Sequence, residues 1–150
     1  MGLDMYLHAK RYLWSYRDES EDKTIATEIQ KIAKIPESFE VQEIIIKAGY
    51  WRKANQIHRW FVENVQSGND DCGHYYVSRQ DLIDLRDLCK EVLENRELAA
   101  TQLPTTSGFF FGTTDYDDWY YQDLTETVEI IDKALTLDQH QWDFEYHSSW

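Results

Sequence analysis

Residues 49–61, GYWRKANQIHRWF, gather side chains that can bind a phosphorylated ligand. The segment holds three basic residues, a histidine, an asparagine and four aromatic rings, without a single acid. A guanidinium group can hold a phosphate through two parallel hydrogen bonds, and an aromatic ring can stack on a nucleobase. Because the whole chain has a formal net charge of −13, this positive segment is a candidate binding surface.

Apolar residues at helical spacing predict a core-packed helix over Tyr50–Val65. Five polar or aromatic residues would share one flank of this helix: Trp51, Arg52, Asn55, His58 and Arg59. We expect these five side chains to line a concave pocket. The alternative interpretation is structural, with Trp51 and His58 at the boundary of the core and the arginines paired with carboxylates.

The segment TTSGFFFGTT, residues 105–114, is a second candidate. Gly108 and Gly112 permit close approach of the backbone, and the flanking hydroxyl groups could hold an anion. The predicted ligand-binding set therefore adds Ser107 and Phe109 from this segment, together with Arg79. The three consecutive phenylalanines favour another interpretation, a buried strand flanked by turns.

Enzymatic signatures are largely missing from the sequence. It lacks the glycine-rich nucleotide motifs, the HExxH zinc motif and the GxSxG nucleophile motif. His58, His74 or His147 could act with a nearby aspartate as an acid–base pair. Neither the scattered histidines nor Cys72 and Cys89 have ligand spacing, so we expect no metal and no cofactor.

Length and charge limit the other classes of function. A chain of 150 residues fits one domain, 1–150, with a core of its own. It has no apolar run long enough to cross a bilayer and no signal peptide, which favours a cytoplasmic protein. From residue 97 onward there are eleven acidic residues and one basic residue. Such a surface repels long nucleic acids and would suit a basic protein partner.

The pattern along the chain predicts an α+β fold. Residues 3–14 and 142–150 favour strands, so a small, mainly antiparallel sheet should include both ends of the chain, packed against three or four helices. Residues 39–47 are read as a strand or an extended segment, and residues 24–35 as a short helix. Ser78 should cap a long helix, with Asp81 completing a capping box, and Asp117 or Asp118 should cap another.

Several motifs resemble a family of small proteins encoded by tailed bacteriophages and prophages. They are GLDMYL, YWRKANQIHRWFV, DDCGHYYVSR, SGFFFG and the terminal YHSSW, and they span nearly the whole chain. The resemblance implies the cytoplasm of an infected bacterium. Small accessory phage proteins often act against host defence, and by analogy we expect such a role for this chain.

Three functions are consistent with these observations. The first is sequestration, without turnover, of a small phosphorylated, nucleotide-like defence signal. The second is inhibition of a host defence protein through the acidic C-terminal third, in mimicry of nucleic acid. The third is a small phosphodiesterase that uses His/Asp acid–base chemistry. Self-association is compatible with all three.

Overall fold

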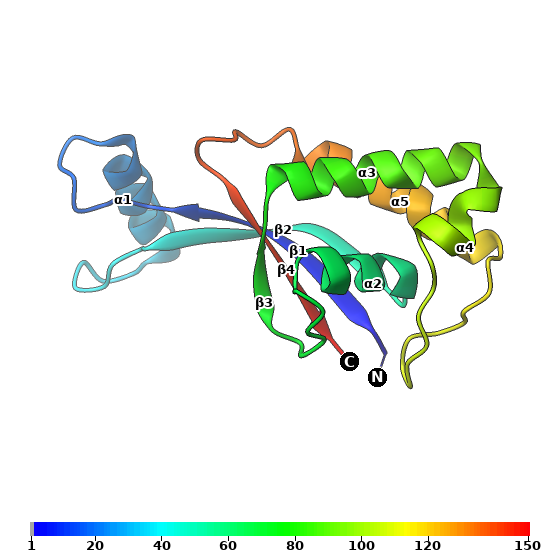
Figure 1. The fold of residues 1–150 in the computed structure, drawn as a ribbon. Coiled ribbons are helices and arrows are strands. Elements are labelled where there is room, and N and C mark those ends of the chain that lie inside the picture. The colour runs from blue at the N-terminus through cyan, green and yellow to red at the C-terminus, as the bar shows by residue number, and fades with distance from the viewer. Residues whose placement is uncertain (1) are drawn as a thin grey trace.

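The computed structural model describes residues 2–150 and confirms an α+β fold. Across these residues one sheet has four antiparallel strands in the order β2-β1-β4-β3. The strands are β1 (Asp4–Tyr12), β2 (Glu43–Arg52), β3 (His74–Val77) and β4 (Asp143–Ser149). As predicted, segments from both ends of the chain belong to the sheet, and they form its two central strands (Figure 1).

Helices cover one face of the sheet and leave the other open. The helices are α1 (Glu21–Ala33), α2 (Asn55–Asn64), α3 (Arg79–Glu94), α4 (Ala99–Gln102) and α5 (Asp118–Ala134), with a short 3-10 helix, η1 (Arg96–Leu98). Met5, Leu7 and Ala9 of β1 are buried against α2, α3 and α5, whereas the residues between them are only half-buried. Because successive strand side chains point to opposite faces, these intervening residues lie on the open face.

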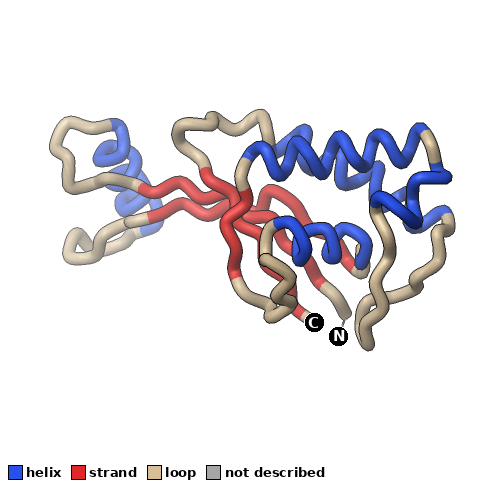
Figure 2. Tube along the Cα trace, viewed as in Figure 1, coloured by secondary structure: helices blue, strands red, loops and turns tan. Residues whose placement is uncertain are grey.

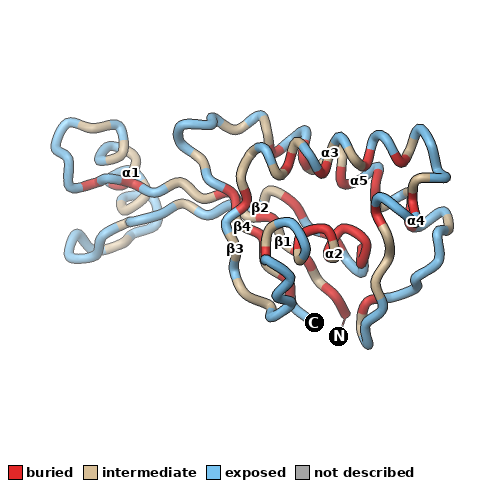
Figure 3. Tube along the Cα trace, viewed as in Figure 1, coloured by how far each residue is buried: buried red, intermediate tan, exposed pale blue. Residues whose placement is uncertain are grey.

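An arm extends from the sheet. Pairing between β1 and β2 continues to Tyr12 and Glu43, beyond the end of the β1–β4 ladder at Lys10, and α1 lies at the tip of this arm (Figure 1). Much of the arm is exposed, in contrast to the strands beneath the helices (Figure 3). The arm therefore contributes little to the main core.

Local signals account for the starts of the main helices. The Ser78 side chain accepts a hydrogen bond from Asp81 N at 3.0 Å, and the Asp81 carboxylate accepts one from Ser78 N at 2.9 Å, which completes the predicted capping box of α3. Asp117 caps α5 by accepting from Tyr120 N. The predicted short helix before Pro36 also forms, as α1.

Two predicted elements are wrong. The helix predicted from Tyr50 begins at Asn55, because Tyr50, Trp51 and Arg52 pair with β1 as the end of β2. Tyr50 lies at helical spacing from the apolar residues of α2 only by coincidence. The strand predicted around Phe109–Phe111 is a loop in the structure (Figure 2). Phe109 is 94% exposed, so the phenylalanine run is not a buried strand.

Candidate functional site

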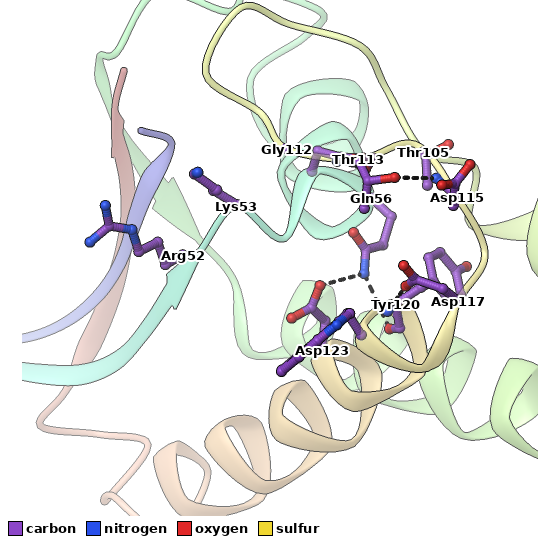
Figure 4. A pocket seen from close by; sticks show the side chains of 12 residues that line it. Arg52, Lys53, Gln56, Thr105, Gly112, Thr113, Asp115, Asp117, Tyr120 and Asp123 are labelled. Carbon is purple, nitrogen blue, oxygen red and sulfur yellow. Dashed lines mark hydrogen bonds between the residues drawn. The ribbon is translucent and has the colours of Figure 1, made fainter. Parts of the chain in front are cut away.

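A pocket of about 250 Å³ lies where the end of β2, the start of α2, the loop before α5 and the first turns of α5 meet (Figure 4). Its lining residues come from these four segments: Arg52, Lys53, Asn55, Gln56, Thr105, Gly112, Thr113, Asp115, Asp117, Trp119, Tyr120 and Asp123. This volume is close to the lower end of the range for small-molecule sites. It fits one nucleoside-sized group better than a dinucleotide.

A strained turn at Lys53 forms one rim of the pocket. Lys53 has a φ of 59°, in the left-handed region that costs a non-glycine residue about 1–2 kcal/mol. Lys53 N donates to Leu3 O at 2.7 Å, and Lys53 O accepts from Asn55 N at 2.8 Å. These bonds hold the turn and allow β2 to pass directly into α2. Backbone strain of this kind is often found at binding sites.

Asn55 fixes the loop that forms the opposite rim. Its amide nitrogen donates to Phe111 O at 3.0 Å and Thr113 O at 2.8 Å, while its oxygen accepts from Thr106 N at 3.0 Å. The side chain is buried, and these three bonds use most of its hydrogen-bonding capacity. Asn55 therefore shapes the pocket from below rather than offering a free group to a ligand.

Gln56 and Asp123 form the polar floor. Gln56 Nε2 donates to Asp123 Oδ2 at 3.1 Å and to Tyr120 O at 3.3 Å (Figure 4). Burial raises the pKa of Asp123 to about 6, partly offset by the hydrogen bond from Gln56. Near neutral pH this carboxyl group can thus exchange a proton when its surroundings change.

Charges of opposite sign lie on opposite sides of the pocket. Figure 4 shows Arg52 and Lys53 on one side of Gln56, with their charged ends directed outward at the rim, and the carboxylates of Asp115 and Asp117 on the other side, while Asp123 lies below Gln56. Within residues 2–150 the side chains of Arg52 and Lys53 form no ion pair and no hydrogen bond. Two unpaired cations beside a pocket provide a site for an anionic group.

Trp119 adds an aromatic surface to the same pocket. Its side chain is 75% exposed although it lies in the first turn of α5. An indole that remains in solvent at the edge of a pocket can stack on a flat ring of a ligand. The pocket therefore combines groups for an anion, a planar ring and a polar ring edge.

The side chains of Trp51 and His58 are buried in the core. Trp51 Nε1 donates to Thr127 Oγ1 at 2.9 Å. His58 Nδ1 lies 2.7 Å from the hydroxyl of Tyr146, and His58 Nε2 lies 3.0 Å from Asp70 Oδ1. Desolvation lowers the pKa of His58, against the opposing effect of Asp70. A neutral imidazole that accepts from Tyr146 and donates to Asp70 satisfies both contacts.

The remaining members of the predicted site are dispersed. Arg59 donates to Glu63 at 2.7 Å and to Thr105 O at 3.2 Å. Arg79 donates to Leu135 O and Leu137 O at the end of α5, far along the chain from the pocket residues. Ser107 and Phe109 line a different hollow, of about 290 Å³, beside Trp150. The expected single pocket of all these side chains is not formed, and Arg52 and Asn55 are the predicted residues that line the pocket of Figure 4.

The sequence patterns did not identify several residues that line the pocket, among them Gln56, Asp117, Trp119 and Asp123. Asp117 was identified only as a helix cap. Gln56 and Trp119 carried a usable signal, an amide next to Asn55 and a tryptophan two residues after the Asp117 cap. Their convergence depends on α5 packing beside α2, which local spacing does not reveal.

Comparisons with known proteins add no relative. The sequence matches no family model, and neither a curated protein nor a solved structure matches the chain at a significant level. Within residues 2–150 no helix is both long and apolar enough to span a bilayer. In the same range no group of three or more His, Cys, Asp and Glu side chains is arranged to hold a metal ion.

Proposed function

We propose that the protein binds a small phosphorylated, nucleotide-like ligand in the pocket of Figure 4 and holds it without turnover, as a phage accessory protein that removes a host defence signal. The observation that carries the proposal is the pair of unpaired cations, Arg52 and Lys53, beside a pocket in a chain of net charge −13. Elsewhere in the fold, Arg59 and Arg79 are engaged by hydrogen bonds.

The parts of the pocket correspond to the parts of a nucleotide. Arg52 and Lys53 bind the phosphate, the indole of Trp119 stacks on the base, and the floor of Gln56 and Asp123 contacts its polar edge. At about 250 Å³ the pocket encloses one nucleoside unit. A larger signal would leave its second unit at the rim, beside Thr105 and Asp115.

Retention without turnover requires preorganisation rather than reactive groups. The left-handed turn at Lys53 and the three hydrogen bonds of Asn55 set both rims before a ligand arrives. A rigid site loses little conformational entropy on binding, so a pocket of modest size can bind tightly.

The test is a thermal-shift and calorimetry panel of mononucleotides, cyclic dinucleotides and ADP-ribose derivatives, with mass spectrometry of small molecules released from the purified protein. We expect at least one compound to stabilise the chain and to be recovered unchanged. Arg52→Ala should weaken its binding about tenfold or more, the loss of one charge-assisted hydrogen bond. Trp119→Ala should also weaken it about tenfold.

Lys90→Ala is the matched control, because it removes an exposed cation from α3, away from the pocket. It should leave binding unchanged. The absence of any shift across the panel, or equal losses in Arg52→Ala and Lys90→Ala, would contradict the proposal. Hydrolysis of the ligand that is lost in Trp119→Ala would contradict retention without turnover in this pocket.

A further inference from the structure

The open face of the sheet carries a cluster of ionisable rings that the pocket does not use. Tyr6 and His8 of β1, His147 of β4 and His74 of β3 lie on this face, because Tyr6 pairs with His147 and His147 pairs with His74 across the strands. The ring centroids of Tyr6 and His147 are 5.3 Å apart, and those of His147 and His74 are 4.3 Å apart. His8 lies 6.4 Å from His147.

Glu145 orients one of these histidines. Its Oε1 atom lies 2.7 Å from His74 Nδ1, and its Oε2 atom accepts from Lys10 Nζ at 2.7 Å. A carboxylate at Nδ1 holds the proton there and leaves Nε2 as the basic nitrogen. The side chain of His74 is more than half exposed, so this nitrogen is accessible to a substrate. The pair has the arrangement of a general base with an orienting partner.

The rest of the open face supplies a proton donor and positive charge. Within residues 2–150 the imidazole of His8 forms no side-chain hydrogen bond, so its ring nitrogens are free to contact a substrate. Lys47 pairs with His8 across β1 and β2, and its ammonium group lies 5.8 Å from the ring centre of Tyr50. Lys47 and Lys10 are the cations beside the histidines on this face, and Lys10 is paired with Glu145.

His147 lies between the base and the proton donor. Burial and the neighbouring His74 and His8 lower the pKa of His147, so its ring is neutral and does not repel a second cation nearby. A phosphate resting above this ring would be within reach of both His74 and His8. The rings of Tyr6, His147 and His74 stack on one another, so their faces are covered and their edges remain open to a ligand. Open ring edges suit hydrogen bonding and proton transfer better than base stacking.

We propose that the open face is a second site, which cleaves short ribose phosphodiesters by transesterification. His74 Nε2 takes the proton of the 2′-hydroxyl, and the 2′-oxygen forms a bond to phosphorus. The bond from phosphorus to the 5′-oxygen breaks, and His8 gives its proton to that leaving oxygen. The products are a 2′,3′-cyclic phosphate and a free 5′-hydroxyl, so the step balances without a metal or other co-reactant.

The substrate is short because of the overall charge. A long polyanion would be repelled by a chain of net charge −13, whereas a dinucleoside monophosphate carries one negative charge and is repelled far less. This site is separate from the pocket, since His8, His74 and Glu145 do not line it. Failure of either proposal would thus leave the other standing.

The experiment incubates the full chain with the ribose dinucleoside monophosphates and their deoxy counterparts and follows the products by chromatography. We expect the ribose substrates to yield the cyclic phosphate and the deoxy substrates to stay intact. His74→Ala and His8→Ala should each lower the rate at least a hundredfold, as loss of a general acid or base does. His140→Ala, which changes an exposed histidine in the turn before β4, should leave the rate unchanged.

Glu145→Gln tests the positioning role. It should lower kcat with little change in KM, because the ring of His74 loses the carboxylate that orients it while the groups that bind the substrate stay in place. Circular dichroism checks that each variant is folded. Absence of cleavage above that of the His8/His74 double variant, or equal rates in His74→Ala, His8→Ala and His140→Ala, would overturn the proposal.

Discussion

His58 shows how a residue that could do chemistry instead connects parts of the fold. Its ring joins the buried hydroxyl of Tyr146 to Asp70, and Asp70 also accepts from Trp150 Nε1 at 3.0 Å. Desolvation keeps the imidazole neutral, since its pKa is lowered. The folded state therefore binds this proton more weakly than the unfolded chain, and stability falls as pH drops below the ordinary histidine pKa of about 6.5.

Asp123 gives the opposite dependence on pH. Its pKa of about 6 in the folded state exceeds the ordinary aspartate value of 3.8, so the penalty for ionising it appears as pH rises from about 4 to 6 and is complete above pH 6. We predict that Asp123→Asn, which keeps an acceptor for Gln56, stabilises the protein at pH 7.5 by about 1–2 kcal/mol after allowance for solvent screening. The gain should vanish near pH 4.

Chemical denaturation at several pH values measures this effect. Glu129→Gln removes an exposed acid from the same helix, α5, and serves as the control, with no comparable change expected. A gain of equal size at pH 4 and pH 7.5 would show that the buried charge of Asp123 is not its cause.

At the scale of elements, the start of α2 and the loop of residues 105–117 behave as one unit. Asn55 joins them through three hydrogen bonds, and Gly112, with a φ of +85°, packs so closely that a Cβ there would lie 3.3 Å from Lys53 Cβ. Within residues 2–150 no strand pairs with the loop. Asn55 is therefore its main anchor, beside single hydrogen bonds from Arg59 to Thr105 O and from Leu3 N to Phe110 O.

We predict that Asn55→Ala destabilises the protein by about 2–3 kcal/mol, because buried backbone groups of the loop lose their partners. The amide proton of Thr106 should exchange faster with solvent, and ligand binding in the pocket should weaken. Hydrogen exchange followed by NMR measures the local effect. Asn69→Ala, at an exposed site, should change neither property. Unchanged exchange at Thr106 would refute this role of Asn55.

The elements that sequence patterns predicted correctly are those fixed by local chemistry. The capping box of Ser78 and Asp81 and the alternation of Phe144 and Tyr146 with polar neighbours are both read within a few residues. Tyr50–Arg52 was assigned wrongly because pairing with β1, more than forty residues away in sequence, overrides the helical spacing. The pocket was predicted only in part for the same reason: Arg52 lay in a visible basic segment, whereas Trp119 and Asp123 reach the site through tertiary packing.

On the scale of the molecule, the arm and the main core are largely independent. Tyr12, Trp14 and Tyr16 form an aromatic cluster on the arm, with ring centroids 4.6 and 5.8 Å apart, and remain substantially exposed. Leu13 and Ala26 are buried locally, yet neither belongs to the main hydrophobic cluster. The tip of the arm thus has a small packing unit of its own.

We predict that replacing residues 14–41 by a two-residue Asn-Gly turn leaves the rest of the protein folded. The pairing of β1 with β2 would be retained, and type I′ turns match the twist of such a hairpin. The shortened chain should unfold cooperatively, bind the pocket ligand with unchanged affinity and retain the NMR signals of α3 and α5. Loss of cooperative unfolding would show that the arm supports the core.

The central position of β1 and β4 has a consequence for how the protein is made. Asp4 pairs with Ser149, so the middle of the sheet joins segments separated by almost the whole length of the chain. Contacts this distant in sequence form slowly, because closing such a loop is entropically unfavourable. During translation, Met5, Leu7 and Ala9 emerge from the ribosome long before Phe144 and Tyr146 are synthesised. Until then the nascent chain exposes an apolar strand without its neighbour, which is a substrate for chaperones.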